Sequence, residues 1–231
     1  MWQKIENANN IIIDTHHPGI GENGIFHNHK TENPLSKDEH IKFALIGNPN
    51  SGKTTVFNAI TGSNQHIGNF PGVTVDIIEG KLLTHINASV IDLTGVYSLT
   101  PYSNEESITT KFLIDNKING IVNIIDITSI ERCLFLTLQL LETRIPMVLC
   151  LNMYDEFRKQ HGYININALE ERLGIPVVPI SAANNEGIDE LIEHAMHIAY
   201  YQEKPLLIEN IINEGISELP ISWRLQTKFV I

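Results

Sequence analysis

The stretch Gly47-Asn48-Pro49-Asn50-Ser51-Gly52-Lys53-Thr54 decides the fold of this chain. An apolar run, residues 41–46, precedes it, and a helical pattern over residues 55–60 follows it. Strand, glycine-containing turn and helix form the context in which a G-x-x-x-x-G-K-[ST] pattern becomes a phosphate-binding P-loop. The stretch therefore predicts an α/β domain that binds a nucleotide.

The residue types in this stretch suit a chain of phosphates. Backbone N–H groups at the positive end of a helix attract anions, and Gly47 and Gly52 let the backbone wrap closely around them. We expect Lys53 to contact the β and γ phosphates and the Thr54 hydroxyl to bind Mg²⁺. The residues expected to line the phosphates are Asn48, Pro49, Asn50, Ser51, Gly52, Lys53, Thr54 and Thr55.

Composition and charge narrow the classes of protein. Hydrophobic residues make up 42% of the 231 residues, which is enough for a sizeable core. The formal net charge of −11 argues against a nucleic-acid partner, whose phosphates need clustered lysine and arginine. Cys133 and Cys150 lie in apolar runs and are expected to be reduced core thiols, which indicates a reducing compartment. No apolar run approaches the roughly 18 residues of a membrane span. The first residues are unlike a signal peptide, so we expect the chain as given to be soluble and cytoplasmic.

The sequence divides into three parts. Residues 1–40 are rich in histidine and asparagine, which predicts a flexible arm, with a loose metal site as the alternative. Residues 41–201 alternate strand and helix patterns. Residues 202–231 resemble the start of a helical domain, because Pro205 breaks the chain and an amphipathic stretch follows. The histidines of the arm are His16, His17, His27, His29 and His40.

The middle part predicts an α/β fold with a mainly parallel, six-stranded sheet flanked by helices. Thr128-x-x-Glu131 and Ser103-x-x-Glu106 have the pattern of capping boxes at helix N-termini. One apolar helical face is formed by Ile188, Leu191, Ile192, Ala195 and Ile198. The strand-like runs are residues 41–46, 75–83, 88–91, 121–125, 146–151 and 176–180.

Two loops carry residues suited to Mg²⁺ and a terminal phosphate. In Gly72-Val73-Thr74, the Thr74 hydroxyl can reach Mg²⁺ and its N–H the γ phosphate. In Asp92-Leu93-Thr94-Gly95, Asp92 can hold Mg²⁺ through a water and the Gly95 N–H can meet the γ phosphate. Because the terminal phosphate orders such loops and its loss releases them, we expect both to act as switches.

A guanine-selective pattern, Asn152-Met153-Tyr154-Asp155, closes the run 146–151. The Asp155 carboxylate can accept hydrogen bonds from guanine N1–H and from the exocyclic amine, a donor pair that adenine lacks. Ser181-Ala182-Ala183 follows the run 176–180, where a backbone N–H can reach guanine O6. Ligands bind open α/β sheets at the carboxyl ends of strands. Together the motifs predict a Ras-like P-loop GTPase that binds GTP and GDP.

With these motifs in place, the chain resembles the ferrous iron transport protein B (FeoB) family, in its cytosolic N-terminal G domain. The resemblance covers about residues 41–200. Met153 in place of lysine is a family-like trait, whereas Thr94 in place of proline and the long arm depart from the family. The segments that carry it are residues 47–54, Gly68-Asn-Phe-Pro-Gly-Val-Thr-Val75, Asp92-Leu-Thr-Gly-Val-Tyr-Ser-Leu99, Asn152-Met-Tyr-Asp155 and Leu173-Gly-Ile-Pro-Val-Val-Pro-Ile-Ser-Ala182.

The resemblance implies a GTPase that regulates Fe²⁺ uptake at the cytoplasmic face of the bacterial inner membrane. It implies the membrane-spanning part of a parent transporter as a partner, and it admits small Feo accessory proteins and a further copy of the chain. It also implies that residues 202–231 begin a helical, GDI-like domain, truncated here, that favours the GDP-bound state.

Hydrolysis is expected to be slow. Catalysis of phosphoryl transfer is mostly positioning and charge stabilisation. Val96 stands just after Gly95, where many small GTPases carry a water-orienting glutamine. Arg132 and Arg144 fit an exposed helix better than the role of an arginine finger. The resemblance implies that Asn50 helps to bind K⁺ beside the phosphates, and the alternative is that it only turns the loop. The expected catalytic residues are Lys53, Asn50, Thr74 and Gly95.

Other interpretations stay open. A soluble assembly GTPase acting on ribosomes or tRNA shares Pro49-Asn50 and the order of motifs, but usually adds a basic RNA-binding module. A GTP-dependent docking module is a third candidate. Glu190, His194 and His197 share one helix face and could bind a metal, although a solvated charged face is the favoured interpretation.

Overall fold

The structure is a computed structural model. It describes residues 5–6, 12–13, 34–36, 39–62, 65–68, 77–100, 104–115 and 118–205. Gly72, Val73 and Thr74 of the first predicted switch lie outside these residues, as do Ser103 and the segment 206–231. The predicted helical domain therefore stays a prediction.

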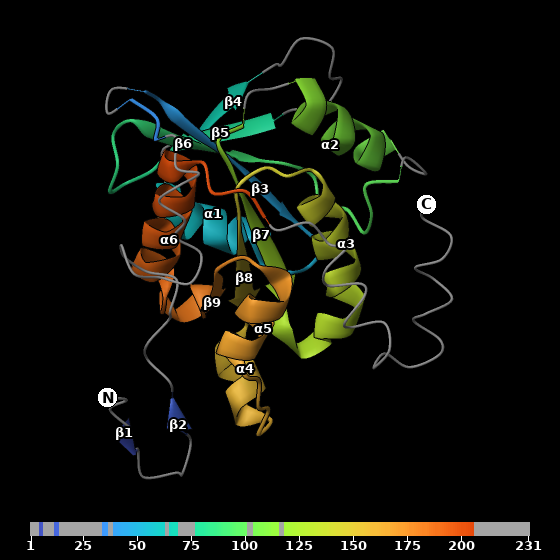
Figure 1. The fold of residues 1–231 in the computed structure, drawn as a ribbon, viewed down its shortest axis with the longest axis vertical. Helices are drawn as coiled ribbons and strands as arrows, with labels where there is room; N and C mark the ends of the chain where they lie inside the picture. The colour runs from blue at the N-terminus through green and yellow to red at the C-terminus, as the bar shows by residue number, and fades with distance from the viewer. Residues whose placement is uncertain are drawn as a thin grey trace.

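A seven-stranded sheet forms the centre of the described part (Figure 1). Five consecutive strands, from β6 to the edge strand β9, run parallel, and two further strands are added antiparallel at the opposite edge. The predicted α/β architecture is thus confirmed, and β4 is an additional edge strand whose sequence offered no apolar run. In sheet order the strands are β4 (Gln65–Gly68), β5 (Ile77–Lys81), β6 (Ala88–Asp92), β3 (Ile41–Gly47), β7 (Gly120–Asp126), β8 (Met147–Asn152) and β9 (Val177–Pro179).

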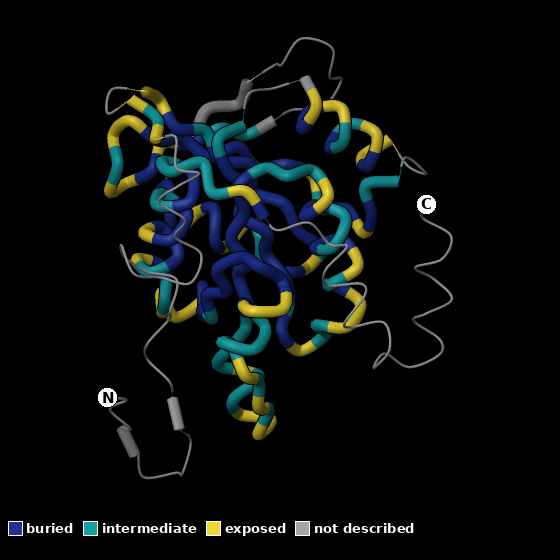
Figure 2. The backbone as a smooth tube through the Cα atoms, viewed as in Figure 1, coloured by how far each residue is buried: buried dark blue, intermediate teal, exposed yellow. Residues whose placement is uncertain are grey.

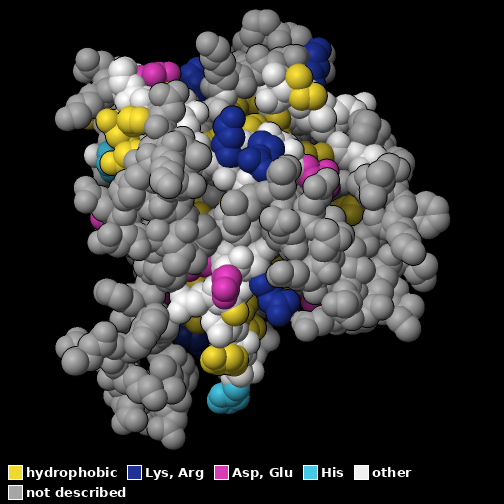
Figure 3. Space-filling view, in the orientation of Figure 1, with side chains coloured by type: hydrophobic (Ala, Val, Ile, Leu, Met, Phe, Trp, Pro, Cys, Tyr) yellow, Lys and Arg dark blue, Asp and Glu magenta, His cyan; other side chains and the backbone are white. Residues whose placement is uncertain are grey.

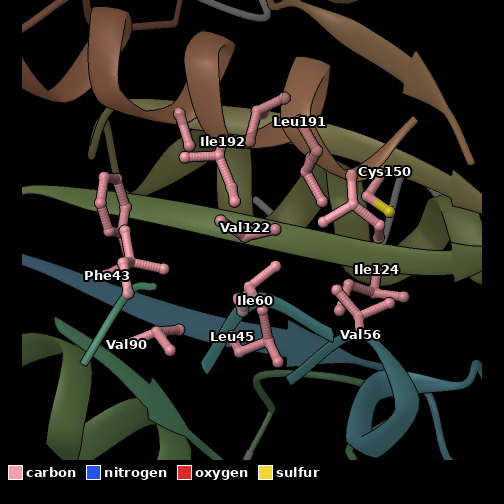
Figure 4. Packing of buried hydrophobic residues seen from close by; sticks show 14 of the residues in the cluster. Phe43, Leu45, Val56, Ile60, Val90, Val122, Ile124, Cys150, Leu191 and Ile192 are labelled. Atoms are coloured by element: carbon pink, nitrogen blue, oxygen red, sulfur yellow. The ribbon is translucent and has the colours of Figure 1, made fainter. Parts of the chain in front are cut away.

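Helices cover both faces of the sheet, which explains why its central strands are mostly apolar. Along β3, Phe43 and Leu45 join one apolar layer, while Ala44 and Ile46 join the other. Helices α1 (Lys53–Thr61) and α6 (Ile188–Tyr201) complete the first layer (Figure 4). The second layer contains side chains of α2 (Asn104–Asp115), α3 (Ile130–Glu142) and α5 (Ile166–Leu173). The buried strands between these helices stand out in Figure 2.

The cysteines belong to these layers. Cys133 and Cys150 are buried and free, as predicted. Burial raises the pKa of both thiols above its ordinary value, so both stay protonated near neutral pH.

The start of α3 differs from the prediction. A short 3-10 turn, Ile127–Ser129, precedes the helix, and Ser129 at the N-cap makes no side-chain capping bond. The Asp126 carboxylate instead accepts hydrogen bonds from Thr128 N at 2.8 Å, from the Thr128 hydroxyl at 2.6 Å and from the Ser129 hydroxyl at 3.0 Å. The predicted capping box of Thr128 and Glu131 is therefore wrong, because Thr128 lies in the 3-10 turn and the N-cap of α3 is Ser129, one residue later.

The predicted apolar face of helix α6 is confirmed, whereas the predicted polar face is partly buried. Ile188, Leu191, Ile192, Ala195 and Ile198 are all buried. His194, however, is only 2% exposed, so the expected solvated face is wrong at that position. His197 Nε2 lies 3.2 Å from Glu203 Oε1 beyond the helix end. Within the described part of the chain, no group of three His, Cys, Asp or Glu side chains could hold a metal ion.

Within the predicted arm, β1 (Ile5–Glu6) and β2 (Ile12–Ile13) form a two-stranded antiparallel pair. His40 Nε2 lies 2.9 Å from Ser89 Oγ on β6. The other four arm histidines lie outside the described residues. None of the helices described here is long and apolar enough to cross a membrane.

Candidate nucleotide-binding site

The P-loop lies between β3 and α1 and needs its glycines for close contacts. A Cβ at Gly47 would collide with the carbonyl oxygen of Ile124, and one at Gly52 with the side-chain amide of Asn152. Gly52 has a φ of 81° and Asn50 a φ of 66°, both in the left-handed region. The loop conformation is therefore set by neighbouring strands as well as by its own sequence.

Buried polar atoms in the P-loop fit an anionic ligand. Asn48 and Ser51 are 2% and 1% exposed. The amide atoms of Asn48 and the hydroxyl of Ser51 have no hydrogen-bond partner within the described part of the chain. Helix α1 begins without a side-chain cap. Because buried polar groups are normally satisfied, these atoms indicate a loop built around a polar ligand.

Lys53 and Asp92 form an ion pair beside this loop. Their side chains are 12% and 10% exposed. Asp92 ends β6, the strand next to β3, so the sheet brings the predicted phosphate-binding ammonium against the predicted Mg²⁺-holding carboxylate. Thr54, the other predicted Mg²⁺ residue in this region, is exposed at the start of α1.

The loop after β6 packs on the P-loop. Val96 N donates to Gly47 O at 3.1 Å. A Cβ at Gly95 would lie 3.1 Å from the backbone nitrogen of Pro49. Gly95, predicted to face the γ phosphate, therefore lies directly against the phosphate-binding loop, and a side chain there would crowd it.

Asn152 joins the P-loop to the segment after β9. Its Nδ2 donates to Ser51 O at 2.9 Å, and its Oδ1 accepts from Ala182 N at 3.1 Å. The side chain is buried. The predicted nucleotide residue Asn152 is thus a brace between two predicted binding segments, because its amide has both a donor and an acceptor.

Asp155 also contacts the segment after β9, through Ser181. Its Oδ1 accepts from Ser181 Oγ at 2.8 Å, and Oδ2 lies 3.1 Å from Lys159 Nζ. The hydrogen bond from Ser181, followed by that from Lys159, lowers the pKa of Asp155 below its ordinary value. Asp155 lies in the first turn of α4 (Tyr154–Lys159), and Met153 before it adopts a left-handed conformation with φ 63°.

Comparison with known proteins assigns the family. A family model described as "Ferrous iron transport protein B" matches residues 41–195. The chain belongs to the ferrous iron transport protein B (FeoB) family. The Fe(2+) transporter FeoB of Escherichia coli K12 is 44% identical over 156 residues, which are 65% of this chain and 20% of the relative. A Fe(2+) transport protein A/Fe(2+) transporter FeoB fusion protein of Porphyromonas gingivalis is 44% identical over 161 residues, covering 68% and 19%. The chain thus matches about a fifth of the length of these relatives.

Solved FeoB structures share the fold. A mutant of NFeoB from S. thermophilus bound to mGDP has a TM-score of 0.67 at 44% identity, covering 69% of this chain and 61% of that one. NFeoB from S. thermophilus bound to mGMPPNP has a TM-score of 0.62 at 45% identity, covering 68% and 61%. The P-loop fold with a mainly parallel sheet is therefore that of a FeoB G domain.

Sequence reasoning missed a buried polar pair behind this FeoB site. Asn123 on β7 and Thr137 on α3 are both 0% exposed. Asn123 Nδ2 donates to Ile46 O at 3.2 Å, and Thr137 Oγ1 donates to Asn123 Oδ1 at 2.7 Å. The pair supports β3 one residue before the P-loop. The signal was a single asparagine inside the apolar run 121–125.

The described surface in Figure 3 carries lysine and arginine as separate small groups with acidic side chains nearby. Of the two arginines weighed as fingers, Arg132 is exposed and Arg144 is partly buried in the turn after α3.

Proposed function

We propose that this chain is the GTP-binding and GTP-hydrolysing G domain of a ferrous iron transporter. The observation that carries the proposal is the meeting of four predicted segments at the carboxyl ends of β3, β6, β8 and β9. Relatives named Fe(2+) transporters and NFeoB structures bound to mGDP and mGMPPNP support it. The segments are residues 47–54, Asp92–Gly95, Asn152–Asp155 and Ser181–Ala183.

Asp155 and the segment after β9 would select guanine. The lowered pKa of Asp155 keeps its carboxylate ionised, ready to accept from guanine N1–H and the exocyclic amine. Ser181 N already donates to Glu186 O, and Ala182 N to Asn152. The N–H that reaches guanine O6 is therefore assigned to Ala183, which lies at the surface beside them.

The P-loop residues would hold the phosphates. The N–H groups of Asn50 and of residues 52–55, together with the Lys53 ammonium, would bind the β and γ phosphates, whereas Pro49 has no N–H and Ser51 N already donates to Asn48 O. Binding then requires Lys53 to exchange Asp92 for phosphate oxygen. Thr54 and Asp92 offer the hard oxygen ligands that suit Mg²⁺. Thr74 would join them as a third Mg²⁺ ligand. Bound Mg²⁺ supplies positive charge to the phosphates.

Slow hydrolysis follows from the loop after β6. Val96 is 2% exposed and packs in the second apolar layer, and it has no group that could orient water. Catalysis then relies on charge at the phosphates from Lys53, on the Gly95 N–H, on Thr74, and on K⁺ held by Asn50. The exposed side chain and left-handed backbone of Asn50 suit both loop turning and ion binding.

At the scale of the parent protein, this domain would regulate Fe²⁺ uptake from the cytoplasmic face of the inner membrane. Its partners would be a membrane-spanning part and small Feo accessory proteins. The relative that unites Fe(2+) transport protein A with FeoB in one chain supports the accessory partner. Transporter relatives at 44% identity favour this role over ribosome or tRNA assembly.

Single-turnover hydrolysis tests the enzymatic part. The chain is mixed with a substoichiometric amount of GTP and Mg²⁺ in KCl or in NaCl, and released phosphate is measured. We expect faster hydrolysis in KCl, with the difference lost in Asn50→Ala. Equal rates in the two salts would refute the K⁺ role. If no phosphate appears over hours in KCl, the chain is a GTP-dependent docking module instead.

A further inference from the structure

The side chain of Gln139, on helix α3, forms two hydrogen bonds with the loop after β6. Its Oε1 accepts from Leu99 N at 2.8 Å, and its Nε2 donates to Thr100 Oγ1 at 3.3 Å. From the other side, Thr110 Oγ1 of α2 donates to Leu99 O at 2.8 Å. Both backbone polar groups of Leu99 are thus bound by side chains of two different helices.

These contacts hold Leu99, at one end of the segment that packs on the P-loop. At the other end, Leu93 N donates to Leu45 O at 3.3 Å. Between the two ends, Val96 N donates to Gly47 O, and Tyr97 is 53% exposed. The segment around Gly95 is therefore held at Leu93 and Val96, and Leu99 fixes the point where it leaves the P-loop.

Helix α3 is itself fixed to the strand that leads into the P-loop. Thr137, two residues before Gln139, bonds Asn123, which in turn bonds Ile46 O. The same helix thus contacts the root of the P-loop through one side chain and the loop after β6 through another. A side chain carried by so firmly packed a helix can hold a loop accurately.

We propose that Gln139 is a positioning residue, which holds Leu99 and Thr100 so that the Gly95 N–H is presented to the terminal phosphate of GTP. The proposal rests on the proposed function. If Leu99 is released, bound GTP must order a longer and looser segment, which costs conformational entropy. GDP lacks the terminal phosphate and does not incur this cost. Gln139 therefore favours GTP over GDP without touching either.

The experiment compares two substitutions at one position. Gln139→Met keeps length and volume but can neither accept from Leu99 N nor donate to Thr100. Gln139→Glu keeps an acceptor for Leu99 N, and the Thr100 hydroxyl can donate to its second oxygen. Glu142→Met, at an exposed position of the same helix, is the matched control. GDP and GMPPNP affinities and single-turnover GTP hydrolysis are measured for each, together with amide hydrogen exchange of residues 96–100 without nucleotide.

For Gln139→Met we expect GMPPNP affinity and hydrolysis to fall about tenfold, the scale of one or two lost hydrogen bonds. GDP affinity should stay within about twofold, and exchange at residues 96–100 should accelerate. Gln139→Glu and Glu142→Met should behave like the unmodified chain.

Three outcomes would overturn the positioning role. One is an unchanged ratio of GMPPNP to GDP affinity in Gln139→Met, with the proposed function still standing. Another is wild-type exchange at residues 96–100 in the same variant. If the unmodified chain binds neither GDP nor GMPPNP, the proposed function fails, and the role at the phosphate fails with it.

Discussion

Two neighbours favour the charged form of the Asp155 side chain. Ser181 Oγ donates to one carboxylate oxygen, and Lys159 Nζ lies near the other. The hydrogen bond from Ser181 is the larger cause of the lowered pKa. A base-reading carboxylate gains from this arrangement, because its acceptor oxygens are already oriented before a base arrives.

The lowered pKa predicts a pH dependence of folding. Because the pKa of Asp155 is lower in the folded than in the unfolded chain, its ionisation stabilises the fold above the unfolded-state pKa. That contribution is lost as the pH falls through the folded-state pKa. We expect Ser181→Ala and Asp155→Asn to lose less stability than the unmodified chain between pH 7 and about pH 3, in urea unfolding. Identical losses in all three chains would contradict the assigned cause.

Replacing Asn152 is expected to lower the stability of the fold as well as its nucleotide binding. In Asn152→Ala, Ser51 O and Ala182 N lose the partner that joins them. We expect the free energy of unfolding to fall by about 1–3 kcal/mol, the usual cost of leaving buried polar groups unpaired. Asn87→Ala, at an exposed turn, is the control for urea unfolding. A fall no larger than that of the control would show that Asn152 is no brace.

At the scale of elements, α3 is the helix that joins the sheet to the loops around the site. Its Thr137 and Gln139 contact Asn123 of β7 and Leu99 of the loop after β6. The remaining buried side chains of the helix are mostly apolar. Two polar contacts in an otherwise apolar interface fix the helix at a defined register, since shifting it would leave buried groups unpaired.

A double-mutant cycle tests the buried pair. Thr137→Val leaves Asn123 Oδ1 without the 2.7 Å donor and should cost about 1–3 kcal/mol of unfolding free energy. Asn123→Leu should cost a similar amount, because Ile46 O also loses its donor. The double variant should cost less than the sum, with a coupling of at least about 0.5 kcal/mol. Strict additivity would mean that the two side chains stabilise the fold independently.

The strand ends were predictable, whereas side-chain partnerships were not. Each apolar run marks a strand, and in a parallel sheet the carboxyl ends of neighbouring strands meet, so the positions of Gly47, Asp92, Asn152 and Ser181 follow from the sequence. The capping pattern at Thr128 failed because a 3-10 turn held by Asp126 occupies residues 127–129, and α3 begins only after it. A capping pattern does not show at which residue the helix begins, and no local pattern reveals the contacts of Gln139, whose partners are distant in sequence.

At the scale of the whole molecule, two apolar layers enclose the central sheet, and its carboxyl edge carries the candidate site. Every predicted binding segment that is described lies at this edge, at the ends of strands and in the loops and first helical turns that follow them. A ligand that joins these segments would stabilise the folded chain by mass action. We expect saturating GDP with Mg²⁺, at about 100 times its Kd, to raise the free energy of unfolding by about 2.7 kcal/mol. ADP at the same concentration should leave the urea unfolding curve unchanged, and an equal rise with ADP would contradict guanine selection.

The central claim is that this edge binds guanine nucleotides through Asp155, and calorimetric titration tests it most directly. GDP and ADP are titrated with Mg²⁺ into the unmodified chain, into Asp155→Ala, and into Asp189→Ala as a control at an exposed position of α6. The account predicts that only GDP binds the unmodified chain and the control, and that Asp155→Ala weakens GDP at least about tenfold. Equal affinities for GDP and ADP, or undiminished GDP binding by Asp155→Ala, would contradict it.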